Sequence, residues 1–312
     1  MKYLSCVLAL TLFLLGGAAL AGVPDELQQI SVTIKAESAQ GSGNIVTRKI
    51  GDDTVSFVWT AAHVVEGLRT TRTVVTPDGS PKILVEYKDA EIVQERQQDG
   101  RRVGEVKFDC KIIKVSDADY GEDLALLMVR CKNAYPASVT TKFHLEKGYI
   151  PPIGVELAHC GSLLGQFGAN SYTTGVLSQT GRTLPMKGAN VKVFDQVTTV
   201  SFPGSSGGGM YLKADGVYIG MLTQGVMKLQ GFNFIVPVRR IHAWAKSAKI
   251  EWAIDPNVEM PSLDTIDALS VEDAGKSPGG YPKAEARVEN TRAAKGVFDF
   301  ATLRDWLERF SK

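Results

Sequence analysis

Residues 204–208 read Gly-Ser-Ser-Gly-Gly, a composition that suits a nucleophilic hydroxyl. A serine nucleophile must project from a tight turn, and nearby backbone N–H groups must be free to bind the substrate oxyanion. Glycine removes the Cβ atoms that would obstruct both. Ser206 directly precedes the glycine pair. We therefore take it as the exposed serine and expect its N–H and that of Gly204 to form an oxyanion hole. A flexible Gly/Ser loop has the same composition, so this stretch alone does not establish catalysis.

A serine hydroxyl becomes nucleophilic when a base takes its proton, and the base is usually a histidine oriented by a carboxylate. The chain has few histidines: His63, His144, His159 and His242. His63 follows the apolar run FVWTAA, and a histidine at a strand exit is placed to reach a cleft. His242 falls in a predicted helix and His144 in a polar loop. His159 could line a site, but a structural role is expected for it.

Asp123 is the candidate carboxylate, because it stands at the mouth of the apolar strand LALLMV. Burying a carboxylate there is costly unless it has a partner. Asp117 and Asp119 lie nearby in a predicted turn, where solvated acidic residues are ordinary. The order His63, Asp123, Ser206 is that of chymotrypsin, whereas the α/β-hydrolases and subtilisin use other orders.

The segments TAAH, DLALL and GSSGG at these positions resemble the trypsin-like serine proteases. They are most similar to the bacterial HtrA/Deg branch, which has a comparable histidine strand, aspartate strand and nucleophile loop. The segment GQFGANSYTTGVLSQTGR also resembles the stretch that precedes the nucleophile in that branch. The resemblance extends over roughly residues 30–244.

The resemblance implies an all-β fold of two six-stranded antiparallel barrels, with a catalytic cleft between them. His63 and Asp123 would come from the first barrel and Ser206 from the second. In such enzymes a strand after the nucleophile pairs with the substrate backbone, which is β-augmentation. The matching residues here are Leu222, Thr223 and Gln224.

Three departures from the family also carry predictions. Trypsin-type enzymes have an acidic residue just before the nucleophile, whereas this chain has Ser205; we therefore expect activity without activation cleavage. A trypsin-like specificity pocket would have Asp at the position of Val200. We expect cleavage after small or apolar residues instead of Lys or Arg. The residues after the protease domain are too few and too polar to form the PDZ domain that HtrA proteins usually carry.

Short runs rich in Val, Ile, Phe and Tyr, separated by turn residues, extend from about residue 27 to 238 and indicate a sandwich or barrel. Residues 237–254 are expected to form a helix with Ile241, Trp244 and Ala245 on one face. We place a protease domain at 22–254 and a mostly disordered linker at 255–296. Residues 297–312 form a predicted amphipathic helix that docks back onto the domain or binds a partner protein. Its apolar face comprises Leu303, Trp306, Leu307 and Phe310.

Residues 1–21 are predicted to be a signal peptide, because a basic residue and an apolar run precede the small-residue site Ala-Leu-Ala. An uncleaved membrane anchor is the alternative. Either way the chain would be secreted or periplasmic, where disulfides form. Cys110 and Cys131 are placed symmetrically in a predicted hairpin. They are expected to form a disulfide, with two unrelated thiols as the alternative. Cys160 is expected to be buried.

The charge of the chain is nearly balanced, with 35 Lys and Arg against 34 Asp and Glu, so the sequence gives no sign of nucleic-acid binding. No cofactor motif and no metal-ligand cluster are found. The leading hypothesis is a serine endopeptidase acting on polypeptides. The alternatives are a protease-fold binding protein without turnover and a serine esterase.

Overall fold

The computed structural model describes residues 22–37, 39–98, 101–185, 191–225 and 231–273. The predicted signal peptide and the predicted C-terminal amphipathic helix both lie outside these residues. No helix within the described part of the chain is long and apolar enough to cross a membrane.

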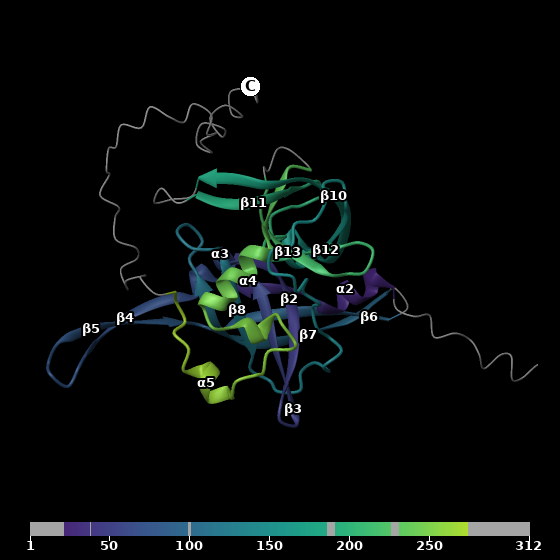
Figure 1. Cartoon of the computed structure of the whole chain (residues 1–312). Coiled ribbons are helices and arrows are strands. Elements are labelled where there is room, and N and C mark those ends of the chain that lie inside the picture. Colours follow the sequence, from purple (N-terminus) through teal and green to yellow (C-terminus); the bar gives the residue numbers. More distant parts are fainter. Residues whose placement is uncertain (1–21, 38, 99–100, 186–190, 226–230, 274–312) are drawn as a thin grey trace, which may run out of the picture.

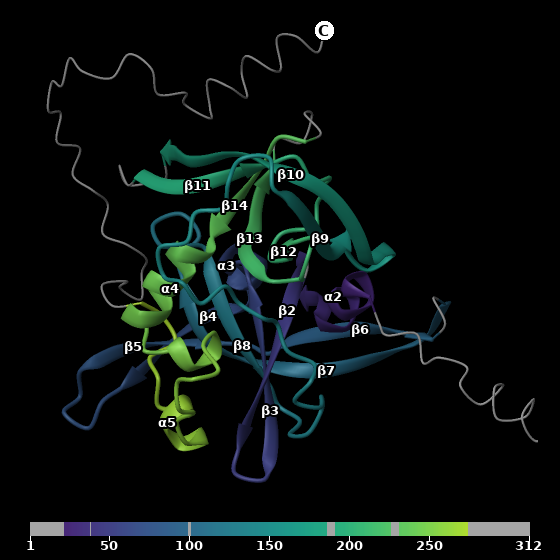
Figure 2. The ribbon, with the colours of Figure 1, turned by 45° about the vertical axis from the view of Figure 1, so that its right-hand side comes forward.

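The predicted double barrel is confirmed (Figures 1 and 2): each barrel is a closed antiparallel sheet of six strands. The first barrel has the order β1-β2-β3-β8-β7-β6 and the second has the order β10-β11-β14-β13-β12-β9. The strands of the first are β1 (Ser31–Ala36), β2 (Ala39–Ile50), β3 (Asp53–Thr60), β6 (Ala90–Gln98), β7 (Arg101–Ser116) and β8 (Leu124–Val129). Those of the second are β9 (Glu156–Leu163), β10 (Gly168–Pro185), β11 (Val191–Val197), β12 (Gly209–Leu212), β13 (Tyr218–Gly225) and β14 (Asn233–Pro237).

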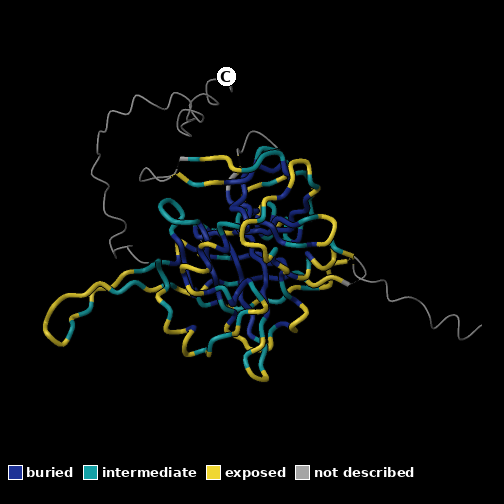
Figure 3. Tube along the Cα trace, in the orientation of Figure 1, coloured by how far each residue is buried: buried dark blue, intermediate teal, exposed yellow. Residues whose placement is uncertain are grey.

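Short helices and one hairpin complete the fold. The hairpin of β4 (Arg69–Val75) and β5 (Pro81–Tyr87) projects from the body, and its tip is exposed (Figure 3). The helices are α2 (Val23–Ile30), α3 (Ala62–Val65), η1 (Glu66–Leu68), η2 (Gly165–Phe167), α4 (Val238–Ser247), η4 (Glu251–Ala253) and α5 (Leu263–Asp267).

Helix α4 follows the second barrel but packs against the first. Its apolar positions recur at helical spacing, as predicted, and Trp244 meets Trp59 of β3 edge-to-face, with ring centroids 5.8 Å apart. The indole of Trp59 is fully buried and donates to the carbonyl of Ala253 at 3.1 Å. A single apolar core therefore joins the first barrel, α4 and the interface between the barrels.

The boundary predicted at residue 254 is wrong, because residues 255–273 are ordered and lie against the first barrel. We call this segment the C-terminal strap. Arg48 of β2 donates to the carbonyls of Asp255 at 2.8 Å and Val258 at 2.9 Å. Farther along, the backbone N–H of Val115 donates to Val271 at 2.7 Å. The polar composition of the strap suggested disorder, but its polar groups bond to the barrel. Residues 274–296 lie outside the described part.

The predicted disulfide is also wrong: Cys110 and Cys131 are both free thiols. The hairpin of β7 and β8 pairs Cys110 with Val129, which is two positions short of the symmetric register. Cys131 therefore lies beyond the end of β8 and is exposed, whereas Cys110 is buried. A β-bulge between Ile112 and Lys114 shifts the pairing, and the sequence symmetry did not reveal it. Cys160 is buried, as expected.

Arg48 gives a test of the strap. Its guanidinium holds main-chain carbonyls of the strap and of η4, so Arg48→Met should lower the free energy of unfolding by about 2–3 kcal/mol. Urea unfolding of the full chain measures this. The adjacent and exposed Lys49 provides the control, because Lys49→Met should change the stability by less than about 0.5 kcal/mol. Equal effects of the two variants would show that the strap does not contribute to stability.

Candidate functional site

His63 and Asp123 form a hydrogen-bonded pair. Asp123 is the last residue before β8 and His63 lies on α3, directly after β3; these two strands are neighbours in the first barrel. His63 Nδ1 lies 3.1 Å from Oδ1 and 3.0 Å from Oδ2 of Asp123, and the His63 backbone N–H donates to Oδ1 at 3.0 Å. The imidazole is therefore held with Nδ1 toward the carboxylate and Nε2 on the other side.

The carboxylate of Asp123 also accepts a hydrogen bond from the second barrel. The hydroxyl of Thr223, on β13, donates to Oδ2. Asp123 is 4% exposed. A buried carboxylate needs such donors, since each one offsets part of its lost hydration. Burial by itself would lower the pKa of His63, but the charge of Asp123 and its hydrogen bond outweigh burial and raise the pKa above 6.5.

The loop that carries Ser206 rests on β2 of the first barrel. The hydroxyl of Ser42 donates to the carbonyl of Gly204 at 2.7 Å, and its backbone N–H donates to the carbonyl of Ser206 at 2.7 Å. Asn44 Nδ2 donates to the carbonyl of Gly207 at 2.9 Å. Three carbonyls of the loop thus accept hydrogen bonds from β2 of the first barrel. The N–H groups of the loop are oriented by a separate turn.

Residues 202–205 form a type II turn that sets the direction of those N–H groups. Ser205 N donates to the carbonyl of Phe202 at 2.9 Å, Pro203 occupies the second position, and Gly204 has φ +97°. A type I turn would need a negative φ at Gly204 and would reverse the peptide plane before it. The N–H groups of Gly204 and Ser206 donate to no other described residue. Both are therefore available for an anionic oxygen.

Gly204 is required for space as well as conformation. A Cβ atom on Gly204 would lie 2.4 Å from the backbone N of Gly165 and 2.5 Å from the carbonyl of Ser162. On the other side of the nucleophile, a Cβ atom on Gly207 would lie 3.0 Å from the backbone N of Ala61, next to the helix of His63. The two glycines thus let the loop approach both barrels closely.

Ser206 Oγ lies in the same cluster but does not bond to His63. It donates to the carbonyl of Thr223 at 3.3 Å. Thr223 therefore contacts two of the candidate residues, Ser206 through its carbonyl and Asp123 through its hydroxyl. Rotation about the Cα–Cβ bond of Ser206 would release Oγ from this carbonyl.

A β-bulge explains how Thr223 makes both contacts. The register of β13 with β14 shifts between Leu222 and Gln224, which leaves Thr223 as the extra residue. The backbone groups of Leu222 are both engaged inside the protein, since its N–H donates to Gly208 and its carbonyl accepts from Gly207. Leu222 therefore has no free backbone group for a substrate, unlike the expectation from sequence.

Val200, the predicted pocket residue, is 37% exposed and lies in the segment before the nucleophile loop. Next to it, Ser201 Oγ donates to Asn233 Oδ1 at 2.6 Å. A Cβ atom on Gly225 would lie 2.4 Å from this amide oxygen, so Gly225 packs directly over the pair. These side chains are all uncharged.

His159 is a buried residue beneath the loop and stays outside the candidate site. Its Nδ1 donates to the carbonyl of Gly209 at 3.0 Å, and burial lowers its pKa to about 4, so the ring is neutral at physiological pH. A Cβ atom on Gly208 would lie 2.5 Å from the ring. The expected structural role agrees with this packing.

Sequence reasoning missed Ser42 and Asn44. Both lie on β2 within the segment Gly-Ser-Gly-Asn, and both are fully buried. Polar side chains two residues apart in a strand face the same side. Two polar positions that alternate with glycines in this strand were the available signal. Thr223 was predicted only for its backbone, and its hydroxyl contact with Asp123 was not foreseen.

Two solved protease structures have a similar fold. An inactive form of a serine-to-alanine mutant of Rv3671c from M. tuberculosis H37Rv has 16% identity and a TM-score of 0.51, covering 78% of this chain and 97% of that one. An inactive form of the Rv3671c protease has 15% identity and a TM-score of 0.51, covering 74% of this chain and 95% of that one. The chain therefore shares the fold of the Rv3671c protease, in line with the double barrel expected of a trypsin-like serine protease.

Deg5 is a looser match to this protease fold, with 21% identity, a TM-score of 0.48, and coverage of 71% of this chain and 89% of that one. No protein-family model and no curated protein sequence matches the chain. Among the residues that the structure describes, no group of three or more His, Cys, Asp or Glu side chains could hold a metal ion.

The His63–Asp123 pair predicts a raised pKa of His63, which can be measured whether or not the protein is an active enzyme. The pKa of His63, measured by NMR, should lie above 6.5 in the wild type, because the charge of Asp123 outweighs burial. In Asp123→Asn the charge is lost and burial remains, so the pKa should fall below 6.5. In Ser206→Ala the pair is intact, and the pKa should stay above 6.5. A pKa that does not fall in Asp123→Asn would mean that the carboxylate does not act on the imidazole.

Proposed function

We propose that this protein is a serine endopeptidase that hydrolyses polypeptides through an acyl-enzyme on Ser206. The observation that carries the proposal is the meeting of the two barrels at one site. The His63–Asp123 pair of the first barrel lies beside a nucleophile loop with two unengaged N–H groups. This combination of a base, an orienting carboxylate and donors for an oxyanion is what acyl transfer needs.

In the proposed reaction Ser206 Oγ leaves the carbonyl of Thr223 and gives its proton to Nε2 of His63. The new Oγ–carbon bond forms as the carbonyl oxygen of the substrate moves toward the N–H groups of Gly204 and Ser206. His63 then protonates the departing amine, and the C–N bond breaks. Water hydrolyses the acyl-enzyme with His63 again as the base. Asp123 holds the imidazole and stabilises its cation throughout.

Uncharged surroundings support a preference for small or apolar residues before the scissile bond. Val200 stands where a trypsin-like pocket has an acidic group, and Ser201 and Asn233 beside it are neutral and bonded to each other. The nearest buried acid on β11, Asp195, is paired with Arg239 at 2.7 Å. A basic substrate side chain would find no counter-charge among these residues.

Ser205 supports activity without a second, activating cleavage. Its hydroxyl accepts from the backbone N–H of Phe202 at 3.0 Å, so the residue before the nucleophile is held within its own turn. We also propose that the protein acts outside the cytoplasm, as the predicted signal peptide implies. A binding protein without turnover and an esterase are the other candidates.

The first experiment labels the protein with a phosphonate probe. We expect covalent labelling at Ser206, because the free N–H groups bind its anionic oxygen and His63 activates the hydroxyl. Ser206→Ala should lose the label, whereas Ser205→Ala should keep it. Absence of labelling in a folded wild type would favour the binding-protein alternative. Hydrolysis of a simple ester without cleavage of casein would favour the esterase.

The second experiment maps cleavage sites in an unfolded polypeptide by mass spectrometry. We expect small or medium apolar residues before the cut bonds, because the side chains around Val200 carry no charge. Val200→Asp should increase cleavage after Lys and Arg by about tenfold, the effect of one new ion pair in a partly buried site. Predominance of Lys and Arg in the wild-type products would overturn the assignment of this pocket.

A further inference from the structure

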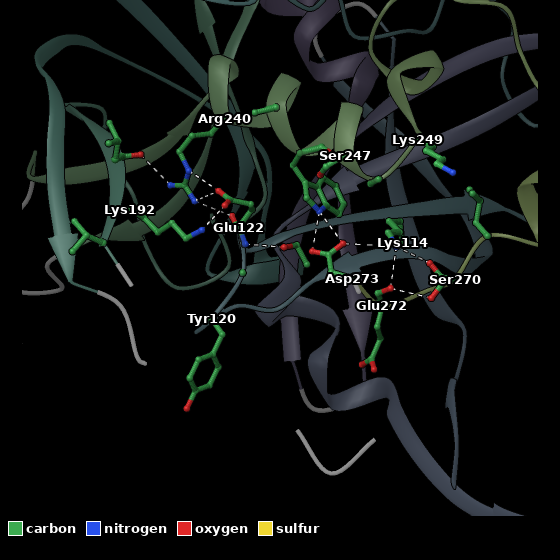
Figure 4. A pocket seen from close by; sticks show the side chains of 18 of the residues that line it. Lys114, Tyr120, Glu122, Lys192, Arg240, Ser247, Lys249, Ser270, Glu272 and Asp273 are labelled. Carbon is green, nitrogen blue, oxygen red and sulfur yellow. Dashed lines mark hydrogen bonds and ion pairs between the residues drawn. The ribbon is translucent and has the colours of Figure 1, made fainter. Parts of the chain in front are cut away.

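Glu122 lies beside the candidate catalytic carboxylate and joins the two barrels (Figure 4). It belongs to the loop between β7 and β8, directly before Asp123. Its carboxylate pairs with Lys192 of β11 and with Arg240 of α4, whose Nε donates to Oε2 at 2.7 Å. Both cations come from elements that follow the first barrel in the chain.

Arg240 is itself fixed in place. Its Nη1 donates to the carbonyl of Val193 at 3.0 Å, and the guanidinium lies 4.7 Å from the ring centroid of Phe194. The exposed fractions of the side chains are 12% for Arg240, 23% for Glu122 and 21% for Lys192. Partly buried ion pairs are screened less than surface pairs. We call these three residues the Glu122 latch.

The loop needs such an anchor because Asp123 has an unfavourable backbone conformation. Its φ is +55°, in the left-handed region that costs a non-glycine residue free energy. The loop has internal bonds, including those from the N–H of Glu122 to Ser116 Oγ at 2.7 Å and from that of Asp123 to the carbonyl of Asp117 at 3.2 Å. These bonds shape the loop, but they do not fix it relative to the second barrel.

We propose that Glu122 is a positioning residue, and that the Glu122 latch holds Asp123 in its left-handed conformation with its carboxylate toward His63 and Thr223. The proposal rests on the proposed function for its effect on turnover. Together with the other latch residues and the end of the strap, Glu122 lines a cavity of about 1110 Å³ (Figure 4). Its carboxylate is engaged by Lys192 and Arg240, so in this proposal it acts on Asp123 through the backbone.

The test replaces Glu122 by Gln in the full chain. We expect kcat to fall about tenfold with KM changed less than twofold, because a displaced Asp123 affects chemistry more than binding. The matched control is Glu86→Gln, which breaks an exposed pair with Arg72 on the β4–β5 hairpin and should leave both constants unchanged. Arg240→Gln should lower kcat as well, and the double variant should be no worse than the more impaired single variant. Unchanged kcat in Glu122→Gln, or additive effects in the double variant, would overturn the proposal.

A second readout separates the latch from the proposed function. The charges of Asp123 and Glu66 and the hydrogen bond to Asp123 raise the pKa of His63. A lower His63 pKa in Glu122→Gln, seen by NMR, would therefore report movement of Asp123. The pKa of His63 can be measured even if the wild type hydrolyses nothing. A wild type without hydrolytic activity would refute only the proposed function. Lys192→Met removes one cation and should give a smaller fall in both kcat and pKa. If neither kcat nor the pKa of His63 changes in these variants, the proposed role of the Glu122 latch is contradicted.

Discussion

The buried carboxylate of Asp123 is the constraint on which the arrangement of the two barrels depends. A charge with so little access to water is tolerated only if donors surround it. Two of those donors belong to His63 and one to Thr223, so the requirement is met only when Thr223 of the second barrel lies against Asp123 of the first. The same contact brings the nucleophile loop, which bonds to the backbone of β13, beside the imidazole. Supplying donors to the buried carboxylate of Asp123 thus brings the residues of the candidate site together.

A second set of contacts between the barrels involves the opposite kind of group. The carbonyls of the nucleophile loop are acceptors, and Ser42 and Asn44 of the first barrel supply the donors. Asn44 also accepts from the N–H of Gly209 and the hydroxyl of Tyr211, so its amide has partners on both sides. The carbonyls are bound from one side, and the N–H groups of Gly204 and Ser206 donate to no other described residue. A loop of glycines and serines, which would be flexible alone, is ordered by its neighbour.

The sequence predicted the barrel architecture, and it singled out three residues that the structure brings into one cluster, because both leave local signals. His63, Asp123 and Ser206 stand next to apolar strands or glycines, and the strand runs alternate with turn residues. The failures concern register and tertiary partners. Cys110 and Cys131 are two positions out of register; the bulge in β7 accounts for one of them and the turn for the other, and neither has a strong sequence signal. The strap looks disordered in isolation because its ordering groups, such as Arg48, lie about two hundred residues away in the chain.

The β-bulge at Thr223 lets one residue contact both Ser206 and Asp123. In a regular strand the backbone of residue 223 would continue the ladder with β14, and its side chain would be fixed to one face by the alternation of the pleat. The extra residue lets Leu222 bind the nucleophile loop while the carbonyl of Thr223 holds Ser206 Oγ and its hydroxyl reaches Asp123. Because the hydroxyl of Ser206 is bonded to this carbonyl, breaking that bond is part of forming the bond to His63. Under the proposed function, an extended substrate that pairs with β13 beyond the last residue bonded to β12 would compete for the same carbonyl. Such a substrate would then favour release of the Ser206 hydroxyl from that main-chain oxygen.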